Sequence, residues 1–485
     1  MAAKPTIVLL PVWGGGHFMP MIEAGKQLLA SSSRALSLTV LLMPAPTAQA
    51  AVAISEHVRR VEAAGDPDIR FHHLPDVKIP TDHSGVEEFI SRIVQLHGPQ
   101  LRAAITGLTC PVAALVFDIF CTPALDVSRD LGVPAYVFFT SGAAMLALLL
   151  RFPALQEEVD VELEEVNDGT LDLPGLPPAP PSVLPETFLD RKTSAYKWVV
   201  HTGRRYVEAN GFIVNTAADL EPRVLAAIAD GRCAPGAPAV YPIGPVLPLT
   251  PPANAEEEEL NECVRWLDLQ PPASVLFLCF GGKGSMATPQ VHEIAHGLER
   301  SGQCFLWVLR GLPENTAHGE RELTDANLGE VLPEGFLEKT KGRGLVWPKR
   351  APQKEILAHA SVGGFVTHCG WNSILESLWF GVPMLPWPLG AEQHFNAFTL
   401  VSDMGVALPL KVDRKRYNFV EAAELERATR SLMAGGEEGV KARDKAMEMM
   451  GLCRKAVDKQ SGSSCASVRR LSEELLREAV LPKRS

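Results

Sequence analysis

Two stretches of the chain each read as a strand, a glycine-rich turn and a helix, and this repeat constrains the fold most. The first runs from an apolar strand at residues 6–12 through Gly14-Gly15-Gly16 into a helix, with Pro20 near the helix start. The second runs from a strand at residues 274–280 through a turn at residues 281–285 into a helix. A strand, turn and helix in this order begin a βαβ unit, in which the strands are parallel.

Further apolar runs of strand length lie among helical patterns, which favours parallel sheets with helices on both faces. These runs are residues 38–43, 113–117, 135–139, 211–215 and 305–309. The predicted fold class is therefore α/β, with two facing Rossmann-like domains. In such folds a ligand binds at the carboxyl ends of the strands, and we expect it between the two domains.

The length of 485 residues is too great for one ordinary core, which also favours two domains. Residues 241–259 read YPIGPVLPLTPPANAEEEE, and prolines followed by four glutamates are typical of a linker. A long surface loop within one domain is the alternative. We predict an N-terminal domain at residues 1–245, a linker at 246–262 and a C-terminal domain at 263–460.

The composition narrows the functional class and the expected location. The net charge of −11 comes from mixed acidic and basic residues, which argues against nucleic-acid and membrane-surface binding. Nine scattered cysteines without a CxxC pair indicate reduced, structural thiols. The apolar run at residues 136–150 is short for a membrane span and reads as a strand end followed by a buried helix. We expect a cytoplasmic, monomeric protein with no signal peptide and no membrane anchor.

Three motifs that would indicate a cofactor or metal are incomplete. Met19 occupies the last position of a GxGxxG pattern, and no suitable acidic residue follows a second strand, so a dinucleotide is disfavoured. Gly282-Lys283-Gly284 lacks the hydroxyl that a phosphate loop places after its lysine. Asp66-Pro67-Asp68 reads as a turn rather than as a metal site. We therefore predict no metal and no cofactor beyond the substrates.

His17 and Asp118 form the first candidate constellation. His17 follows three glycines at a helix start, where the positive end of the helix dipole disfavours the imidazolium and suits a general base. Asp118 ends a strand, from which it could orient His17 and balance its charge. A loop histidine and a capping aspartate are the structural alternatives.

The second constellation lies in residues 350–393, RAPQKEILAHASVGGFVTHCGWNSILESLWFGVPMLPWPLGAEQ. A strand at residues 362–367 leads to His368, Asn372 and Ser373 at the start of a helix at residues 371–380, which Gly381 and Pro383 end. The N–H groups at such a helix start suit a diphosphate. Another strand at residues 384–388 leads to Glu392 and Gln393, whose carboxylate and amide suit sugar hydroxyls. The alternative is that the aromatic groups belong to the core and the polar groups cap helices.

Over its whole length this segment closely resembles the signature box of the plant family 1 UDP-glycosyltransferases. The segment GGGHFMP at residues 14–20 resembles that family's Gly-His-Pro region, and VFDIF at residues 116–120 resembles its aspartate strand. The resemblance implies a GT-B fold and inverting, metal-independent transfer of glucose from UDP-glucose. It also implies that a C-terminal helix at residues 461–485 packs back on the N-terminal domain.

The resemblance also implies a role for each matching residue. It implies that His17 and Asp118 form the catalytic dyad. A terminal Gln is usual for glucose donors in that family. The implied UDP-binding residues are Ser285, Arg350, Ala351, Gln353, His368, Asn372, Ser373 and Glu376, with Gln353 and Glu376 at the ribose, and the implied sugar-binding residues are Trp371, Glu392 and Gln393.

The chain departs from the family pattern at two positions. Arg350 stands where the family has a Trp that stacks on uracil. A guanidinium plane can stack on a base, and Trp347 is the alternative. Gly282 stands where the family has a phosphate-contacting Ser or Thr, for which Lys283 or Ser285 could compensate.

The acceptor implied by the resemblance is a small phenolic such as a flavonoid. Candidate acceptor-facing residues are Phe18, Phe120, Phe139 and Leu184, and each could equally belong to the core. Two other functions stay open: a C-glycosyltransferase on the same scaffold, and a non-catalytic protein that binds UDP-sugar.

Overall fold

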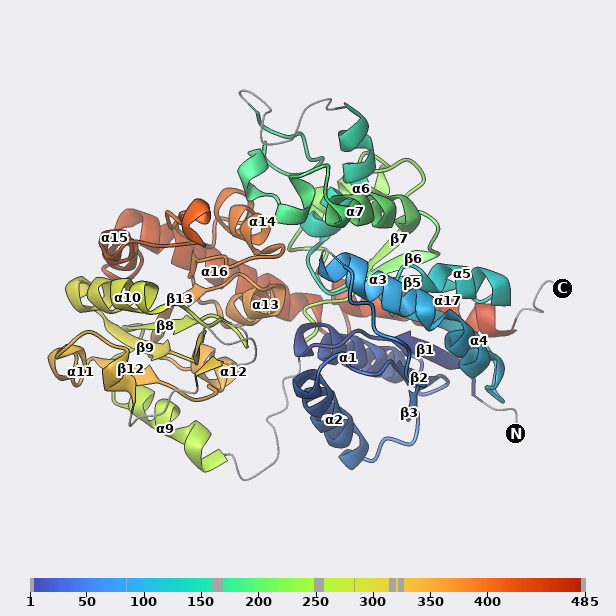
Figure 1. Ribbon diagram of the computed structural model, residues 1–485, viewed down its shortest axis with the longest axis horizontal. Helices are drawn as coiled ribbons and strands as arrows, with labels where there is room; N and C mark the ends of the chain where they lie inside the picture. The colour runs from blue at the N-terminus through green and yellow to red at the C-terminus, as the bar shows by residue number, and fades with distance from the viewer. Residues whose placement is uncertain are drawn as a thin grey trace. The chain divides into compact units, whose positions relative to one another are not determined.

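The computed structural model of the chain describes residues 4–83, 85–158, 169–247, 257–282, 284–313, 320–321 and 327–480. The chain forms two compact units. The first consists of Met1–Leu249 with Cys453–Ser485, and the second of Thr250–Leu452. Figure 1 traces both units in colour from the N-terminus to the C-terminus, and each is described here by itself.

A seven-stranded parallel sheet forms the centre of the first unit. Its order is β3-β2-β1-β4-β5-β6-β7, so the direction of winding reverses between β1 and β4. The strands are β1 (Thr6–Leu10), β2 (Ser37–Leu42), β3 (Ile69–His73), β4 (Val112–Asp118), β5 (Ala135–Phe139), β6 (Gly211–Val214) and β7 (Ala239–Pro242).

Helices cover both faces of this sheet (Figure 1). On one face, residues of α1, α2 and α17 share a core with alternate residues of the strands, such as Ile7 and Leu9. On the other, Tyr206 of α7 packs against Phe139 and Phe212. The helices are α1 (Gly15–Ser31), α2 (Ala48–Ala63), α3 (Val86–Leu96), α4 (Gly98–Thr106), α5 (Ala124–Leu131), α6 (Ala143–Glu158), α7 (Ser194–Tyr206), α8 (Pro222–Ala229) and α17 (Ser463–Val480), with short turns η2 (Pro181–Val183) and η3 (Glu186–Phe188).

The second unit has a five-stranded parallel sheet of order β12-β9-β8-β13-β14, which reverses its winding between β8 and β13. The strands are β8 (Val275–Cys279), β9 (Cys304–Val308), β12 (Gly344–Trp347), β13 (Val362–Thr367) and β14 (Met384–Pro386), beside a small hairpin of β10 (Leu312–Pro313) and β11 (Glu320–Arg321).

The helices of the second unit include α10 and α15, which pack against each other through buried apolar side chains such as Leu298 and Leu425. The helices are α9 (Glu257–Asp268), α10 (Thr288–Ser301), α11 (Phe336–Lys339), α12 (Gln353–Leu357), α13 (Trp371–Phe380), α14 (Gln393–Phe398), α15 (Ala422–Met433) and α16 (Glu437–Ala456), with the turns η4 (Leu328–Glu330), η5 (Thr399–Asp403) and η6 (Arg414–Arg416).

The two parallel sheets confirm the predicted α/β class with two Rossmann-like domains. The apolar run at residues 136–150 is a strand followed by a buried helix, as expected. Three strands of the two parallel sheets escaped prediction, as did the small hairpin. β3 reads IRFHH and has half-exposed or exposed side chains, so no apolar run marks it, and β7 and β12 are four residues long with no more than two buried side chains each.

The predicted linker at residues 246–262 lies partly outside the described residues, because 248–256 are not among them. Its last positions, 257–262, belong to helix α9. Cys263 and Leu267 of this helix are fully buried, and their burial gives the segment a reason to be helical. At the other end, the second unit stops at Leu452 within α16 rather than at residue 460.

α17 belongs to the first unit, where it packs on α1, β4 and β7. A carboxylate fixes it there, because Glu474 accepts hydrogen bonds from the hydroxyls of Tyr136 (2.8 Å) and Tyr241 (2.5 Å). The Arg470 guanidinium lies 4.6 Å from the centre of the Tyr241 ring. These contacts anchor the helix to two strands of the sheet.

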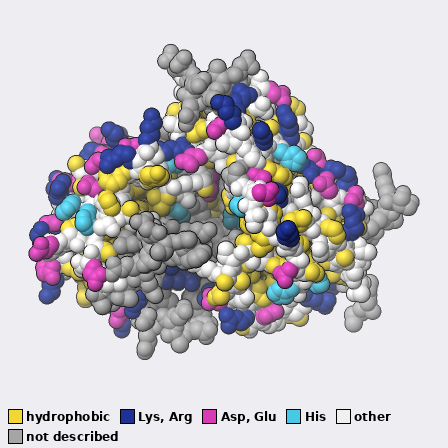
Figure 2. Space-filling model, in the orientation of Figure 1, with side chains coloured by type: hydrophobic (Ala, Val, Ile, Leu, Met, Phe, Trp, Pro, Cys, Tyr) yellow, Lys and Arg dark blue, Asp and Glu magenta, His cyan; other side chains and the backbone are white. Residues whose placement is uncertain are grey.

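Charged side chains are interspersed on the face shown in Figure 2, without a single-sign patch. Within the described segments, no helix is both long and apolar enough to cross a membrane. All nine cysteines are free thiols. The two carboxylates of Asp66-Pro67-Asp68 are held by basic groups, since Asp68 accepts from Lys4 at 2.7 Å and from Arg34 at 2.8 Å, and Arg34 also pairs with Asp66. This motif is therefore an ion-paired turn before β3.

Candidate active site

His17 lies in the first turn of α1, because this helix begins earlier than the sequence suggests. The helix begins at Gly15, and Gly14 caps it with φ of 119°, a conformation that favours glycine. The His17 and Phe18 amides donate to the Gly14 carbonyl at 3.1 and 2.9 Å. Pro20, expected near the helix start, lies inside the helix. Pro20 lies beyond the first turn because Gly15 and Gly16 already belong to that turn.

Asp118 ends β4, the strand beside β1, and its carboxylate meets His17. The distance from His17 Nδ1 to Asp118 Oδ2 is 2.8 Å, although 101 positions separate the two residues. The Asp118 side chain is fully buried, whereas 28% of the His17 side chain is exposed. Sheet order brings them together, because both follow the carboxyl ends of the strands at which the winding reverses.

The pairing determines which nitrogen of His17 can act as a base. A carboxylate accepts hydrogen bonds, so Nδ1 carries the proton that faces Asp118. In the neutral ring, Nε2 then holds the free electron pair. A second polar atom, Thr140 Oγ1, lies 3.4 Å from Nδ1. Thr140 lies just beyond β5, and no motif in the sequence points to it.

The turn after β4 holds Asp118 in place. The Phe120 amide donates to Asp118 Oδ1 at 3.2 Å, and the Cys121 amide donates to the Asp118 carbonyl at 2.8 Å. The Tyr206 hydroxyl donates to the Ile119 carbonyl at 2.9 Å. Burial, and then the Asp118 charge, raise the pKa of the Cys121 thiol well above its usual value, so this thiol stays protonated beside the carboxylate.

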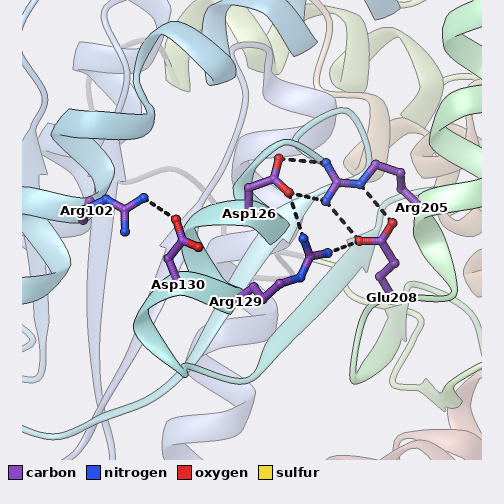
Figure 3. A network of polar contacts seen from close by, with 6 residues as sticks. All are labelled: Arg102, Asp126, Arg129, Asp130, Arg205 and Glu208. Atoms are coloured by element: carbon purple, nitrogen blue, oxygen red, sulfur yellow. Dashed lines mark hydrogen bonds and ion pairs between the residues drawn. The ribbon is translucent and has the colours of Figure 1, made fainter. Parts of the chain in front are cut away.

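Figure 3 shows the ion pairs that anchor the end of α7. Tyr206 is the last residue of this helix. Arg205 donates to both carboxylate oxygens of Asp126 on α5, at 2.9 and 2.7 Å. Arg129 pairs with Asp126 and with Glu208, which Arg205 also contacts. The network joins α5 to α7 next to the turn that carries Asp118.

Of the four aromatic or aliphatic residues predicted to face an acceptor, one contacts His17. The Phe120 ring lies 5.5 Å from the imidazole, centre to centre. Phe18, Phe139 and Leu184 have at most 1% of their surface exposed and belong to the core. Their burial favours the core alternative for these three residues.

The second cluster begins at His368, which follows β13 where the sheet of the second unit reverses its winding. Two glycines leave room for its ring. A Cβ atom on Gly370 would lie 2.4 Å from His368 Nε2, and one on Gly281, which follows β8, would lie 2.8 Å from Cε1. Burial lowers the pKa of His368 to about 4, so the imidazole is neutral at physiological pH.

The backbone between His368 and α13 is fixed by buried groups. Cys369 is fully buried and has φ of 65°, which turns the chain sharply into the helix. Asn396 donates to the Cys369 carbonyl at 2.9 Å. Gly370 is the N-cap, and Trp371, Asn372 and Ser373 form the first turn of α13. The backbone N–H groups of a helix start are a suitable seat for a phosphate.

One turn further along α13, three predicted residues form a hydrogen-bonded group. The Gln353 amide nitrogen donates to Ser373 Oγ at 2.9 Å and to Glu376 Oε2 at 2.7 Å. Burial raises the pKa of Glu376, and the bond from Gln353 partly offsets that rise. The structure therefore brings Gln353, Ser373 and Glu376 together, as expected for residues that share one ligand.

Glu392 and Gln393 follow β14, which ends at Pro386, two residues before its predicted end. Gln393 begins α14, and its side-chain carbonyl accepts from the amides of Leu389 (2.8 Å) and Gly390 (3.1 Å). The amide nitrogen is the end of Gln393 that remains to donate to a ligand.

The two positions that depart from the family pattern are placed differently. Arg350 is exposed, whereas Trp347 is 5% exposed, and its indole N–H donates to the Arg350 carbonyl at 3.2 Å. Arg350 is thus the more accessible planar group, with Ala351 half-buried beside it. Gly282 is exposed and Ser285 is half-buried in the turn after β8, and Lys283 lies outside the described residues.

Comparisons with known proteins place this geometry among the UDP-sugar-dependent transferases. Residues 266–434 match the model of the UDP-glucoronosyl and UDP-glucosyl transferase family. The chain is 68% identical to a malvidin galactosylase of Oryza sativa subsp. indica over 99% of each chain. It is 39% identical to an anthocyanidin 5,3-O-glucosyltransferase of a Rosa hybrid cultivar over 96% of this chain and 98% of the relative.

A solved structure gives the same fold. The UGT2 of Phytolacca americana, complexed with UDP-2-fluoro-glucose and pterostilbene, superimposes with a TM-score of 0.84 at 34% identity. The superposition covers 97% of this chain and all of the other chain.

Proposed function

Since the chain belongs to the plant family 1 UDP-glycosyltransferases, we propose that it transfers a hexose from a UDP-hexose to a hydroxyl of a phenolic acceptor. The observation that carries this proposal is the His17–Asp118 pair, a buried carboxylate 2.8 Å from a partly exposed imidazole. Such a pair suits the removal of a proton from a hydroxyl group at neutral pH.

In the proposed mechanism, His17 Nε2 removes the proton of the acceptor hydroxyl as its oxygen attacks the anomeric carbon of the hexose. The new carbon–oxygen bond forms as the bond from that carbon to the diphosphate oxygen breaks. UDP leaves with the electron pair, and the anomeric configuration inverts. Asp118 stabilises the imidazolium that His17 becomes.

We propose that the start of α13 binds the leaving diphosphate. The positive end of the helix dipole and the backbone N–H groups there stabilise the negative charge that develops on UDP. Because His368 is neutral, it can donate a ring N–H to the diphosphate without carrying a second ring proton that would have to be released. The Gln353–Glu376 pair is proposed to bind the ribose, and Arg350 to stack on the uracil.

Two donors compete in the proposal. The terminal Gln393 predicts UDP-glucose, and the Rosa relative is named a glucosyltransferase. The Oryza relative, which is far more similar to this chain, is named a malvidin galactosylase. We therefore propose UDP-galactose as the preferred donor and UDP-glucose as the second. The acceptor class proposed is an anthocyanidin or another flavonoid.

The test is a donor and acceptor screen with the purified chain. UDP-galactose and UDP-glucose are tested separately against malvidin and a panel of flavonoids, because the two hexosides have the same mass. We expect a product with one added hexose, released by acid hydrolysis, and an anomeric proton coupling that shows inversion. Absence of transfer from every UDP-hexose would reject the proposal, and a product that resists acid would indicate a C-glycoside.

A further inference from the structure

The loop that carries Glu392 and Gln393 is held by a residue from outside the signature segment, Asn418. The Asn418 side-chain nitrogen donates to the Leu389 carbonyl at 3.0 Å, and its side-chain oxygen lies 2.8 Å from His394 Nε2. The indole N–H of Trp387 donates to the backbone carbonyl of Asn418 at 2.9 Å. Asn418 therefore contacts the loop at three positions, Trp387, Leu389 and His394.

Geometry fixes the orientation of the Asn418 amide. The Leu389 carbonyl can only accept, so the NH₂ group must face it. The amide oxygen then faces His394, whose Nε2 must therefore be the donor. Both ends of the amide are used, and Asn418 is 9% exposed, so these bonds form in a largely dry environment in which losing them is costly.

The backbone around Asn418 is fixed as well. Asn418 has φ of 61°, in the left-handed region that asparagine tolerates better than most residues. Asp413 and Phe419 exchange two backbone hydrogen bonds, at 2.8 and 3.1 Å, and close the turn that contains Asn418. The Arg416 guanidinium lies 4.1 Å from the centre of the Phe419 ring. The amide is therefore presented from a closed turn.

A short chain of hydrogen bonds connects Asn418 to the amide of Gln393. Asn418 holds the carbonyl of Leu389, and the Leu389 amide donates to the side-chain carbonyl of Gln393 at 2.8 Å. Any rotation of the backbone at Leu389 changes the direction in which the Gln393 NH₂ group points. Glucose and galactose differ only in the direction of one hydroxyl, so this direction matters for the choice of donor.

We propose that Asn418 is a positioning residue that orients Gln393 and thereby sets the preference between UDP-hexose epimers. This inference rests on the proposed function, in which Gln393 contacts the sugar. It assigns no direct ligand contact to Asn418, and it leaves the nucleotide seat at α13 independent of that residue.

The test compares Asn418→Gly with Tyr417→Gly. Glycine keeps the left-handed backbone at either position. Asn418→Gly removes both side-chain hydrogen bonds. Tyr417→Gly removes the side chain of a neighbouring residue that also has a left-handed backbone, with φ of 55°, and is 97% exposed. Titration calorimetry gives the affinities for UDP, UDP-galactose and UDP-glucose, and turnover gives kcat/KM for both donors.

We expect Asn418→Gly to change the affinity ratio of the two UDP-hexoses by about fivefold or more and to leave the affinity for UDP within about twofold. Tyr417→Gly should change neither. Asn418→Asp, which keeps an acceptor for His394 but sets a carboxylate oxygen against the Leu389 carbonyl, should also shift the ratio.

An unchanged ratio in both Asn418 variants would overturn the proposal, and so would an equal weakening of all three ligands. The binding ratio does not depend on turnover. A wild-type protein that binds both UDP-hexoses without transferring either would therefore contradict the proposed function while leaving this test decisive.

Discussion

The two clusters occupy the same topological position in their units and have opposite electrostatic character. Both follow strands between which the winding of a parallel sheet reverses, β1 and β4 in one unit and β8 and β13 in the other. In the first, a partly exposed imidazole faces a buried carboxylate. In the second, burial lowers the pKa of His368 and raises that of Glu376, so both pKa values move toward favouring the neutral forms.

This difference indicates that one architecture can support two tasks, proton transfer and ligand binding. A histidine beside a carboxylate can take a proton and have its new charge balanced. A histidine held neutral between two glycines can hydrogen-bond a ligand without titrating. We infer that the first cluster moves a proton and the second holds a nucleotide. If the two tasks are separate, variants in the first cluster should change kcat and variants in the second should change UDP binding.

The largest effect is expected from His17→Ala. Removal of the general base should lower kcat by about 10³-fold, within the range for acid–base catalysis, because alanine has no group that can accept the proton. The measurement is the initial rate of hexoside formation. His57→Ala is the matched control. His57 lies on α2, where its ring stacks on that of Phe18 from α1, and this variant should retain most activity. Equal losses of kcat in the two variants would contradict the role of His17 as the general base.

Asp118→Asn should lower kcat by about 10²-fold, the lower end of the range for acid–base catalysis and less than the loss of His17 itself. The amide keeps the shape of the side chain but supplies no charge to balance the imidazolium. KM for the donor should hardly change. Rates are measured at saturating acceptor and donor, with the circular dichroism spectrum as a check of folding. A rise in donor KM with kcat intact would contradict the assignment.

His368 should make the stability of the protein depend on pH. Its pKa is about 4 when folded and near 6.5 when unfolded, so the unfolded state binds more protons between these values. Stability should therefore fall as pH decreases through this window, by about 2 kcal/mol between pH 7 and pH 5. Urea unfolding of the wild type and of His368→Gln at both pH values isolates this contribution. An identical pH dependence in the two proteins would refute it.

Gly370→Ala should weaken UDP binding by about tenfold, or 1.4 kcal/mol. The new Cβ would lie 2.4 Å from His368 Nε2, so the imidazole must shift. Gly329→Ala is the matched control, because nothing lies within 4 Å of its added Cβ. Calorimetric titration with UDP measures both. Equal affinities in the two variants would show that the position of His368 does not matter to the nucleotide.

The smallest effect is expected from Tyr206→Phe, which removes the hydroxyl that donates to the Ile119 carbonyl next to Asp118. kcat should fall about fivefold with little change in KM, because the turn that carries Asp118 loses one restraint. Tyr136→Phe removes an equally buried hydroxyl that bonds to Glu474 instead. Parallel kcat values for the two variants would mean that Tyr206 contributes only to stability.

The sequence predicts much of the fold because the signals are local. The helix at residues 371–380 has the bounds expected from its glycine and proline neighbours, and the strand at residues 362–367 has those expected from its apolar run. β3 could not be predicted because it lacks such a run. Pro20 misled the prediction of the start of α1 because proline normally marks a first turn.

The candidate site was predictable where its residues are contiguous or match a motif. Gln353, Ser373 and Glu376 come from one segment, and the structure brings them together. Thr140, Tyr206 and Asn418 carry no such signal. Their contacts depend on the order of strands and on a turn far along the chain, which no spacing in the sequence reveals. The cytoplasmic location and the monomeric state stay predictions.

One titration series tests the central claim most directly. UDP is titrated calorimetrically into the wild type, His17→Ala and Gly370→Ala under the same conditions. We expect His17→Ala to bind UDP within about twofold of the wild type and Gly370→Ala to bind it about tenfold more weakly. If His17→Ala weakened UDP binding as much as Gly370→Ala, the separation of proton transfer from nucleotide binding would be contradicted.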